Sequence, residues 1–426
     1  MHLAMDLHSH SGYAGGVGSM SFEDIERNMP CKGISVVGTG DCLHPLWRKT
    51  LENTLRDCGT GLYEYREGSP LSYLLQTEII FTADIGARRK GVHVVLFFPS
   101  FEAIDAVTDL FSRWGVKNTV GRPFVTCADP QEVGERIAAM YAADDGIEVV
   151  PAHVMTPEGV FGSKAPVDTL SGFFGEAAER MPIIETGLSA DPLVLSLVPE
   201  LDGRTFISNS DAHSAALHRM GREFTSVTCP RSYDAILSAL RHNRVDATGE
   251  FHPSEGRYFL TGHRASRAGH DGRSCVYGPG RAPSDRRCPI CGKQLTIGVL
   301  ERALDLSRIQ GDERAMEDMR AVTPFYHMVP LVEVIARARG IASCSSAKVL
   351  LAYHAITSVV PECALWGLSS GRIASRLAGV ADENVVRAII DVREGRFSFE
   401  PPGYDGEYGE LSIGDARDCR DICICH

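Results

Sequence analysis

Residues 205–213, TFISNSDAH, join a short apolar run to a polar end that carries Asp211 and His213. Other short apolar runs end in the same way: ISVVGTGD (34–41), SYLLQTE (72–78), GVHVVLFFP (91–99), IEVVPAH (147–153) and MPIIETG (181–187). Helix-like stretches, such as 21–29 and 101–115, lie among these runs. Such alternation is typical of repeated βα units with a mainly parallel sheet. The predicted fold class is therefore α/β, with a barrel whose chemistry collects at the C-terminal ends of its strands.

The length of 426 residues predicts more than one domain, because single hydrophobic cores rarely grow beyond about 250–300 residues. From about residue 250 the pattern changes to Gly, Arg, His and Ser, and amphipathic helical segments begin at residue 298. We therefore expect a barrel over 1–250, a small metal-stabilised module over 251–297, a helical region over 298–410 and a frayed tail over 411–426.

The composition is that of an ordinary globular protein, with 44% hydrophobic and 8% aromatic residues. No run of about 18 apolar residues predicts a membrane span, and the start MHLAMDLHSH lacks the pattern of a signal peptide. The thirteen cysteines are mostly scattered singly, as are Cys31 and Cys127, rather than arranged as a disulfide framework. Reduced thiols in the cytoplasm, and a monomer, are the expectation.

The net charge of −12 argues against a simple nucleic-acid binder, but the charge is unevenly distributed. Residues 257–302 hold nine Lys and Arg against three Asp and Glu. A basic island of this kind can steer a phosphate backbone towards the protein, although a solvated Arg-rich loop has the same composition. The acidic excess elsewhere is partly explained if carboxylates gather around metal ions.

His8 and His10 stand two residues apart behind an apolar run, and residues i and i+2 of a strand point to the same face. The spacing alone is weak, because polar strand ends often face solvent. Other strand ends supply the same donor types, which raises the odds of a shared metal site. The candidate ligands are His8, His10, Asp41, His44, Glu78, His93, His153, Asp211 and His213.

These nitrogen and oxygen donors include no Cys, so they suit more than one Zn²⁺, Mn²⁺ or Mg²⁺ ion with positions left open for water and phosphate. Open positions favour catalysis over a closed structural site. Glu78 can bridge two ions, and a bridging hydroxide is a nucleophile near neutral pH. Glu78, Asp211 and His213 are the candidate catalytic residues. Glu185 and Asn209 are candidates for orienting these ligands, with structural roles as the alternative.

The sequence CPICG at 288–292 predicts a second metal site, because its tight turn aims the thiolates of Cys288 and Cys291 at one ion. A redox pair is the competing interpretation, but no thioredoxin-like strand and helix surround it. Cys275 is the candidate third ligand of a structural zinc, and His263 or His270 is the fourth.

Residues near these sites can contact DNA. Ser163 and Lys164 in FGSK can bind a phosphate, although an exposed loop lysine needs no function. Arginines of the basic island can contact the DNA backbone, with Arg264, Arg286 and Arg287 as the candidates. Tyr404 and Tyr408 in PGYDGEYG can stack on a base, and packing is the alternative for both.

The strand-end residues of positions 1–250 resemble the polymerase and histidinol phosphatase (PHP) domain, which implies a distorted seven-stranded βα barrel holding up to three metals. One departure lies in GDCLH, where His44 stands three residues after Asp41 instead of directly after it. The roles of these two residues therefore stay open.

Several longer stretches resemble the endonuclease Q family over about residues 3–410. They are GTGDCLHPLW, PAHVMTPEGVFGSK, ETGLSADP, ISNSDAHS, CPICGKQLTIGVLERALDL and PGYDGEYG. The resemblance implies metal-dependent DNA cleavage on the 5′ side of uracil, hypoxanthine, xanthine or an abasic site, leaving a 3′-hydroxyl and a 5′-phosphate. A sliding clamp is a conceivable partner, but the tail contains no clamp-binding peptide.

Two other functions remain open at this point. The barrel chemistry also suits a phosphatase of small phosphate monoesters, which has no evident use for the zinc module or the basic island. A DNA-binding repair scaffold with a vestigial site is the non-enzymatic alternative, and the nearly complete ligand set speaks against it.

Overall fold

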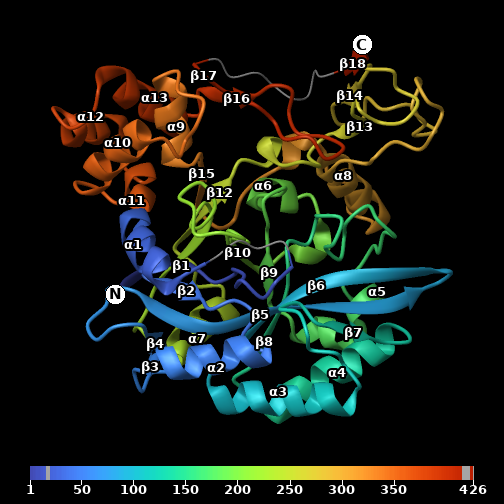
Figure 1. Cartoon of the computed structure of the whole chain (residues 1–426). Helices are drawn as coiled ribbons and strands as arrows, with labels where there is room; N and C mark the ends of the chain where they lie inside the picture. Colours follow the sequence, from blue (N-terminus) through green and yellow to red (C-terminus); the bar gives the residue numbers. More distant parts are fainter. Residues whose placement is uncertain (16–19, 415–422, 426) are drawn as a thin grey trace.

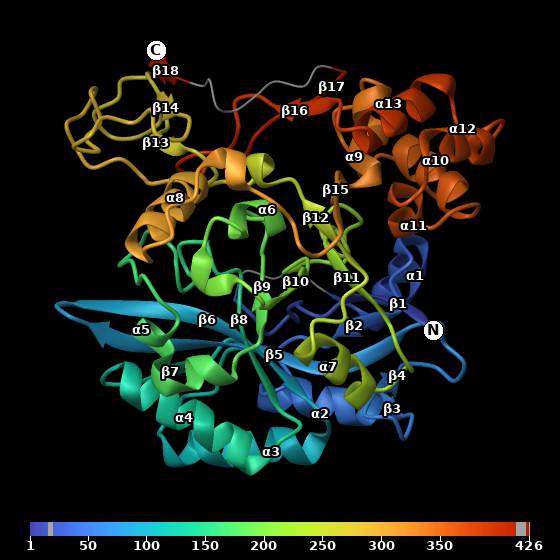
Figure 2. The same ribbon diagram turned by 180° about the vertical axis from the view of Figure 1, so that it is seen from behind.

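The computed structural model describes residues 1–15, 20–414 and 423–425 (Figure 1). The blue-to-green part of the chain forms a mixed α/β body. The C-terminal helices and the yellow module around residues 261–297 lie above this body, at opposite ends, and the view from behind shows the same arrangement (Figure 2).

The largest sheet places strands from the start of the chain beside strands from residues 224–251. Its main path runs β15 (Phe325–Met328), β12 (Ala247–Phe251), β11 (Phe224–Thr228), β1 (His2–Asp6), β2 (Val36–Gly38), β5 (Ser72–Ile85), β4 (Tyr63–Glu64) and β3 (Arg56–Asp57). Three more strands extend it through β5: β6 (Arg88–Phe98), β7 (Phe124–Thr126) and β8 (Glu148–Pro151). A separate parallel pair joins β9 (Ile183–Glu185) to β10 (Thr205–Ile207).

The expectation of a mainly parallel sheet is wrong, because the sheet contains both parallel and antiparallel pairs. β1 is parallel to β2 but antiparallel to β11, and β5 is parallel to β2 and β7 but antiparallel to β6. The physical reason is the long β5–β6 hairpin, whose turn includes Gly86 with a φ of 58°. A tight turn of this kind returns the chain antiparallel, whereas a parallel neighbour requires a crossover connection.

Helices flank this sheet, and most begin at the polar residue that the sequence provides. Ser21, Ser100, Asp129 and Ser232 each accept a hydrogen bond from a backbone N–H of the first turn that follows. The helices are α1 (Phe22–Lys32), α2 (Pro45–Thr54), α3 (Phe101–Arg113), α4 (Pro130–Ala143), α5 (Ser171–Phe174), α6 (Pro192–Leu195) and α7 (Tyr233–Arg241). Short 3₁₀ turns are η1 (Gly175–Arg180), η2 (Pro199–Leu201), η3 (Pro253–Glu255) and η4 (Met316–Asp318).

The C-terminal half contains a small sheet followed by a group of helices. In the sheet, β13 (Thr261–His263) pairs with β14 (Cys275–Tyr277), and β14 pairs with β18 (Cys423–Cys425). The helices that follow are α8 (Val299–Ile309), α9 (Leu331–Ala338), α10 (Ala347–Thr357), α11 (Glu362–Trp366), α12 (Ser370–Leu377) and α13 (Glu383–Arg393). Two strands, β16 (Phe397–Phe399) and β17 (Leu411–Ile413), pair antiparallel beside them.

The expected tail is not wholly frayed, because residues 411–413 and 423–425 lie in strands; its residues 415–422 and 426 lie outside the described part of the chain. Within the described ranges, no helix has the length and apolar character needed to cross a bilayer.

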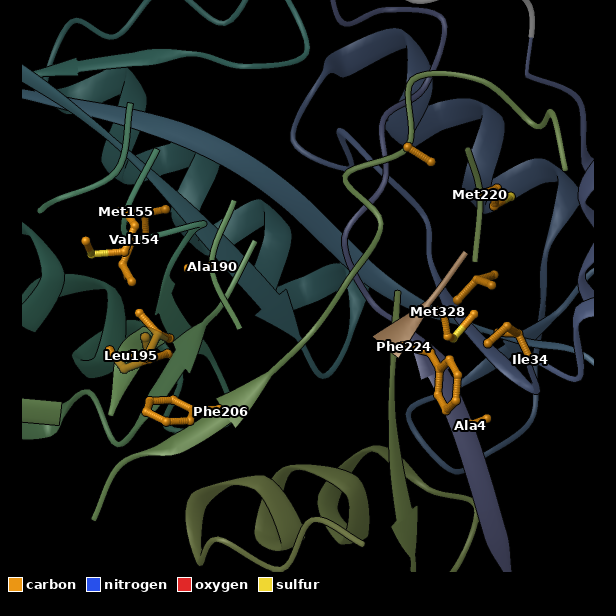
Figure 3. Close-up of a cluster of buried hydrophobic side chains, with 14 of the residues drawn as sticks. Ala4, Ile34, Val154, Met155, Ala190, Leu195, Phe206, Met220, Phe224 and Met328 are labelled. Atoms are coloured by element: carbon orange, nitrogen blue, oxygen red, sulfur yellow. The ribbon is translucent and has the colours of Figure 1, made fainter. Parts of the chain in front are cut away.

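One hydrophobic core joins the barrel part to the C-terminal helices. It runs from Phe224 and Ile34 through Met328 of β15 to Ile335 of α9 and Ile389 of α13. Figure 3 shows Met328 beside Phe224 and Ile34 in one cluster, with a second cluster formed around Leu195 and Phe206. Because β15 pairs with β12 of the main sheet, the barrel part and the helices share both a core and a sheet edge.

Candidate metal centre

The candidate ligands stand at strand ends that converge on one place. His8 and His10 follow β1, His153 follows β8, and Asp211 follows β10, whereas Glu78 and His93 lie within β5 and β6. Pairing of β5 with β6 places Glu78 opposite Val95, which lies two residues from His93 and on the same sheet face. All of these residues except His93 and Asp211 are nearly inaccessible to solvent.

Two groups of three residues each bring their donor atoms within 4.8 Å of one another. The first is His8, His10 and Asp211, and the second is Glu78, His93 and His153. Oε1 of Glu78 lies 2.7 Å from Nδ1 of His93 and 3.1 Å from Nε2 of His153. Its other oxygen, Oε2, lies 3.5 Å from Nε2 of His10 in the first group. Glu78 therefore stands between the two groups, where a bridging carboxylate is expected.

Two orphaned atoms test whether the pocket suits a cation. Among the described residues, Nε2 of His8 and Oε2 of Glu78 are buried without a hydrogen-bond partner. A buried polar atom left unpaired is costly, and a bound cation would satisfy both atoms at once. Imidazole and carboxylate donors without a thiolate suit Zn²⁺, Mn²⁺ or related ions. The residues present therefore fit a pair of bound metals.

The electrostatics of the site also favour positive charge. Burial by itself lowers the pKa of His8, but Glu185, Asp211 and Glu78 outweigh burial and raise that pKa to about 9. The pKa values of His10 and His153 are raised to about 9 because neighbouring carboxylates overcome burial there too. Burial opposes the ionisation of Asp211, yet His10 and His8 hold the pKa of its carboxyl below the usual range. The carboxylates thus create a buried negative potential.

The carboxylate of Glu185 orients His8, a member of the first donor group. Nδ1 of His8 lies 2.9 Å from Oε1 of Glu185, which leaves Nε2 of that ring facing the cluster. Asn209 donates to Glu185 over 2.8 Å, and its own Oδ1 accepts from the backbone N–H of Leu7 over 2.7 Å. The backbone N–H of His153 donates to the second Glu185 oxygen over 2.9 Å. Such support fixes the ring orientation of a ligand histidine.

The structure places three candidate ligands outside the two groups, within the part of the chain that it describes. Asp41 accepts from both the N–H and the hydroxyl of Ser11 over 2.6 Å, and it lies 3.2 Å from Nδ1 of His10. It therefore supports His10 from the side that faces away from Asp211. His44 stacks on Tyr13 with ring centroids 4.4 Å apart, and Nδ1 of His213 lies 2.9 Å from the Asp211 carbonyl oxygen. Direct ligation by these three residues stays a prediction.

The second candidate metal site contains five side chains with sulfur or nitrogen donor atoms: four that form one close set, and Cys275 beside them. His263, His270, Cys288 and Cys291 have donor atoms within 4.8 Å of one another, a set that suits a tetrahedral zinc. The individual distances are 3.2 Å from His263 to His270, 3.4 Å from His270 to Cys288 and 3.5 Å from His263 to Cys291. Sγ of Cys275, the predicted third ligand, lies 3.6 Å from Sγ of Cys288. His270 therefore competes with Cys275 for one of the four positions.

Two of the predicted DNA-contacting arginines bind acceptors of the protein itself. The guanidinium of Arg264 donates to the backbone carbonyl of Asp405, while its backbone N–H donates to the Asp405 carboxylate, and Arg286 pairs with Asp305 at 2.6 Å. Arg287 is exposed and donates to the carbonyl of Gly292. The fold thus leaves Arg287 as the freest of the three predicted arginines.

The other predicted DNA contacts lie in two loops. Tyr404 is only 7% exposed and packs inside, whereas Tyr408 is 50% exposed. The side chain of Lys164 is exposed, and its carbonyl accepts from the buried Lys90 over 2.9 Å, which anchors the loop that also carries Ser163.

A cavity of about 300 Å³ opens directly beside the metal cluster. Two arginines and two aromatic side chains that sequence patterns did not indicate, Arg122, Arg257, Phe251 and Tyr258, line it together with the predicted Tyr408. Periodicity carried no signal for them, because they lie in loops or at strand ends. The lining includes His93, His153, Glu185 and Asp211 of the centre, together with Arg122, Leu188, Phe251, Arg257, Tyr258 and Tyr408.

Two solved structures have a fold similar to that of this chain. The lesion-specific endonuclease PfuEndoQ from Pyrococcus furiosus superposes with a TM-score of 0.79 at 27% identity, over 97% of this chain and 96% of the other. A second endonuclease Q, in complex with a 27-mer duplex substrate with an abasic lesion at the active site, gives a TM-score of 0.78 at 26% identity over 100% and 99% of the two chains. The chain therefore resembles endonuclease Q in fold and sequence over nearly its whole length. The resemblance read from its sequence is thereby confirmed.

Two relatives match the chain by sequence, one over most of its length and one over about half. The uncharacterized protein YqxK of Bacillus subtilis is 25% identical over 390 residues, which is 89% of each chain. An uncharacterized protein of Methanocaldococcus jannaschii is 29% identical over 245 residues, or 55% of this chain. The matched region spans only 29% of that archaeal relative. No protein-family model matches the chain.

Proposed function

We propose that the chain is a metal-dependent DNA repair endonuclease that hydrolyses the phosphodiester on the 5′ side of a deaminated base or an abasic site. The deaminated bases are uracil, hypoxanthine and xanthine, and the products carry a 3′-hydroxyl and a 5′-phosphate. The observation that carries the proposal is the position of Glu78, which joins two groups of metal-ligand type beside a cavity lined by aromatic and basic side chains.

The domain organisation supports this function. We interpret residues 1–250 as a distorted seven-stranded PHP barrel, 251–297 as a zinc module, 298–410 as a helical DNA-binding region and 411–426 as a tail. The strand-end donors at the centre, the His and Cys cluster of the module and the helices α8 to α13 support these assignments in turn. A DNA duplex is the expected partner, since one family member was crystallised with such a substrate.

His8, His10 and Asp211 would hold one metal, and His93 and His153 would hold a second, with Glu78 shared between them. Zn²⁺, Mg²⁺ or Mn²⁺ bound there would neutralise nonbridging phosphate oxygens and make water more acidic. The chain itself supplies orientation, because Glu185 and Asp41 fix the outward nitrogens of His8 and His10. Arg122 lines the cavity with a guanidinium nitrogen 3.6 Å from Glu78, where it can donate to a phosphate oxygen.

The cavity gives the lesion a place outside the DNA stack. An enzyme that recognises one altered base by its Watson–Crick edge gains access to that edge by extruding the nucleotide, and an already weakened or missing base is the least costly to extrude. Phe251, Tyr258 and Tyr408 provide apolar and aromatic surface, while the main chain of Gly187–Ser189 lines the same cavity. Deamination converts an exocyclic amine donor into a carbonyl acceptor, so N–H donors in such a lining can recognise the altered edge.

Further properties are proposed from the sequence. Scattered cysteines support a reducing cytoplasmic location, and we expect a monomer. Recruitment by a sliding clamp has little support, because the tail lacks a recognisable clamp-binding peptide, although residues 415–422 and 426 lie outside the described structure.

One assay tests the function. Protein loaded with Mg²⁺, Mn²⁺ or Zn²⁺ is incubated with labelled duplexes containing one deoxyuridine, one deoxyinosine or one abasic site, and the ends are mapped. A nick 5′ to the lesion supports the proposal. Absence of that nick with every metal, together with turnover of small phosphate monoesters, would establish the phosphatase alternative. Binding without cleavage would indicate the repair scaffold.

The Asp211→Asn variant is the matched site control for this assay. It removes an ionised donor while keeping the shape of the side chain, so nicking should be lost while the melting temperature stays close to that of the wild type. Retained nicking would contradict the assignment of Asp211.

A further inference from the structure

We propose that Asp405 is a positioning residue that holds Tyr408 as one wall of the lesion cavity, and that Tyr408 thereby distinguishes base-containing lesions from abasic sites. The inference rests on the proposed function and goes beyond it, since it assigns substrate discrimination to one turn. That turn, residues 403–409, lies about 190 residues after Asp211, the last donor of the two groups in the sequence.

The turn is fastened along one side to the segment that follows β12. The N–H of Gly403 donates to Ser254, that of Gly406 donates to Arg257, and that of Gly409 donates to Glu255, over 2.7, 2.9 and 3.1 Å. In return, Nε of Arg257 donates to the carbonyl of Gly406 over 2.9 Å. These bonds place the turn at the rim of the cavity.

Tyr408 and Arg257 form a stacked pair at this rim. Cζ of Arg257 lies 5.3 Å from the centroid of the Tyr408 ring, within the range of a cation–π contact. Both side chains line the cavity, and Tyr408 remains 50% exposed. An exposed aromatic ring beside a nucleotide-sized cavity offers a stacking surface that any base can use and that an abasic sugar cannot.

Asp405 fixes this turn from the other side, through the zinc module. Its Oδ1 accepts from the Thr296 hydroxyl over 2.6 Å and from Arg267 over 2.7 Å. Its Oδ2 accepts from the backbone N–H of Arg264 over 3.0 Å, and the Arg264 guanidinium donates back to the Asp405 carbonyl over 3.1 Å. Asp405 is buried with a φ of 44°, a conformation that an ordinary side chain adopts only when its surroundings hold it.

The three donors belong to the immediate surroundings of the candidate zinc ligands. Arg264 follows His263, the N–H of His270 donates to the carbonyl of Arg267, and Thr296 pairs with Gly262 in an isolated bridge. Figure 1 shows the red segment after β16 reaching across to the yellow module, where it meets β13. The module therefore uses Arg264 and Arg267 to support the cavity wall, which gives it a role other than a clamp on the DNA backbone.

The test compares kcat/KM on two duplexes that differ only at the lesion, one with deoxyuridine and one with an abasic site. Loss of base stacking corresponds to about 5-fold to 150-fold. Tyr408→Ala should lower kcat/KM on the deoxyuridine duplex by at least about 10-fold and leave the abasic duplex within about 2-fold. Tyr408→Phe should behave as the wild type, because stacking needs the ring and not the hydroxyl. Equal losses on both duplexes would overturn the inference.

The positioning role of Asp405 is tested by coupling. Asp405→Asn should reproduce the lesion-selective loss, and the double variant Asp405→Asn/Tyr408→Ala should be no worse than Tyr408→Ala alone. Additive losses, or a loss on the abasic duplex, would show that Asp405 is merely structural. The exposed Glu410→Ala in the same segment is the control. If Asp405→Asn does not fold, Thr296→Val, which removes one donor, replaces it with the same criteria.

The wild type separates this inference from the proposed function. A wild-type protein that nicks neither duplex would refute the function itself. A wild-type protein that nicks both, with variants that do not discriminate between them, would refute only the role assigned to Tyr408 and Asp405.

Discussion

Nδ1 of His8 lies 2.9 Å from Oε1 of Glu185, and neither side chain is accessible to solvent. The two residues are 177 positions apart in the sequence. The contact turns Nε2 of the imidazole towards Asp211 and Glu78. Glu185 belongs to neither donor group, yet it determines the orientation of His8, which belongs to the first group.

Glu185→Gln should weaken metal binding at the centre by about 10-fold to 100-fold, because the amide cannot hold the ring with an ionised oxygen. Metal affinity measured by competition with a chromophoric chelator checks this. The exposed Glu179→Gln serves as the control. An unchanged affinity would mean that Glu185 has only a packing role.

Gly121→Ala should disturb the centre without touching a donor. A Cβ at this position would lie 2.5 Å from Cγ of Asp41, whose oxygens hold His10 and Ser11. We expect nicking to fall at least about 10-fold and unfolding free energy to fall by about 1–3 kcal/mol. Gly371→Ala, where an added Cβ meets nothing within 4 Å, should leave nicking unchanged. Wild-type activity in Gly121→Ala would show that Asp41 is dispensable.

Zinc content distinguishes the candidate ligands of the module. Cys291→Ser and His270→Ala should each release about one zinc per chain, because both residues belong to the set of four donors. Cys275→Ser should keep its zinc, since the four other donors already complete a tetrahedron. Metal analysis after gel filtration measures this. Zinc loss in Cys275→Ser together with retention in His270→Ala would restore the ligand set read from the sequence.

The stability of the protein should depend on the protonation of Glu250. Burial raises the pKa of its carboxyl from the ordinary value of 4.5 to about 7, although the Ser208 hydroxyl hydrogen-bonds to it. Its charged neighbours are Asp191, His327 and Glu223. The folded state prefers the protonated form, so this stabilisation is complete below about pH 4.5 and is lost as the pH rises through 7.

Glu250→Gln should therefore be more stable than the wild type at pH 8, by up to about 3 kcal/mol, and close to it at about pH 4, where the carboxyl is largely protonated in both the folded and the unfolded state. Urea unfolding at the two pH values measures the difference. The exposed Glu313→Gln should change neither value. A difference that is the same at both pH values would show that Glu250 does not titrate in this range.

A buried ion pair joins the barrel part to the C-terminal helices. Nζ of Lys32 in α1 lies 2.9 Å from Oε2 of Glu362 in α11, and both side chains are essentially inaccessible. Tyr353 and the backbone N–H of Leu331 also donate to Glu362, each over 2.9 Å. Glu362→Gln should lower the unfolding free energy by about 3–5 kcal/mol, because Lys32 would be left as an unpaired buried charge.

The double variant Lys32→Met/Glu362→Gln should be more stable than Glu362→Gln alone, since no charge is then stranded. Urea unfolding of the three proteins measures the coupling. Additive destabilisation would indicate that the two residues act independently.

Much of the helical half could be read from local patterns. The sequence shows amphipathic helical segments near 298–310, 328–340, 345–360 and 371–394, and they correspond to α8, α9, α10, and α12 with α13. Of the apolar residues at helical spacing in the third segment, Val349, Tyr353 and Ile356 are buried, whereas Leu350 is only partly buried. Helical periodicity is a property of neighbouring residues, so it survives without knowledge of the fold. The relative direction of neighbouring strands cannot be read in this way, because a hairpin turn and a crossover connection leave similar apolar runs in the sequence.

The sequence by itself determined the chemistry: imidazoles and carboxylates at successive strand ends, a Cys-x-x-Cys turn, and the stretches that resemble endonuclease Q. Tertiary structure decided which of them meet. It brought His10 within 3.1 Å of Asp211 across 201 positions, set Glu78 between two groups, and placed Asp41 and His44 outside these groups. It also buried Tyr404 and left Tyr408 at the cavity. Residue type follows from the chain alone, whereas the direction of each side chain depends on long-range pairing and loop closure.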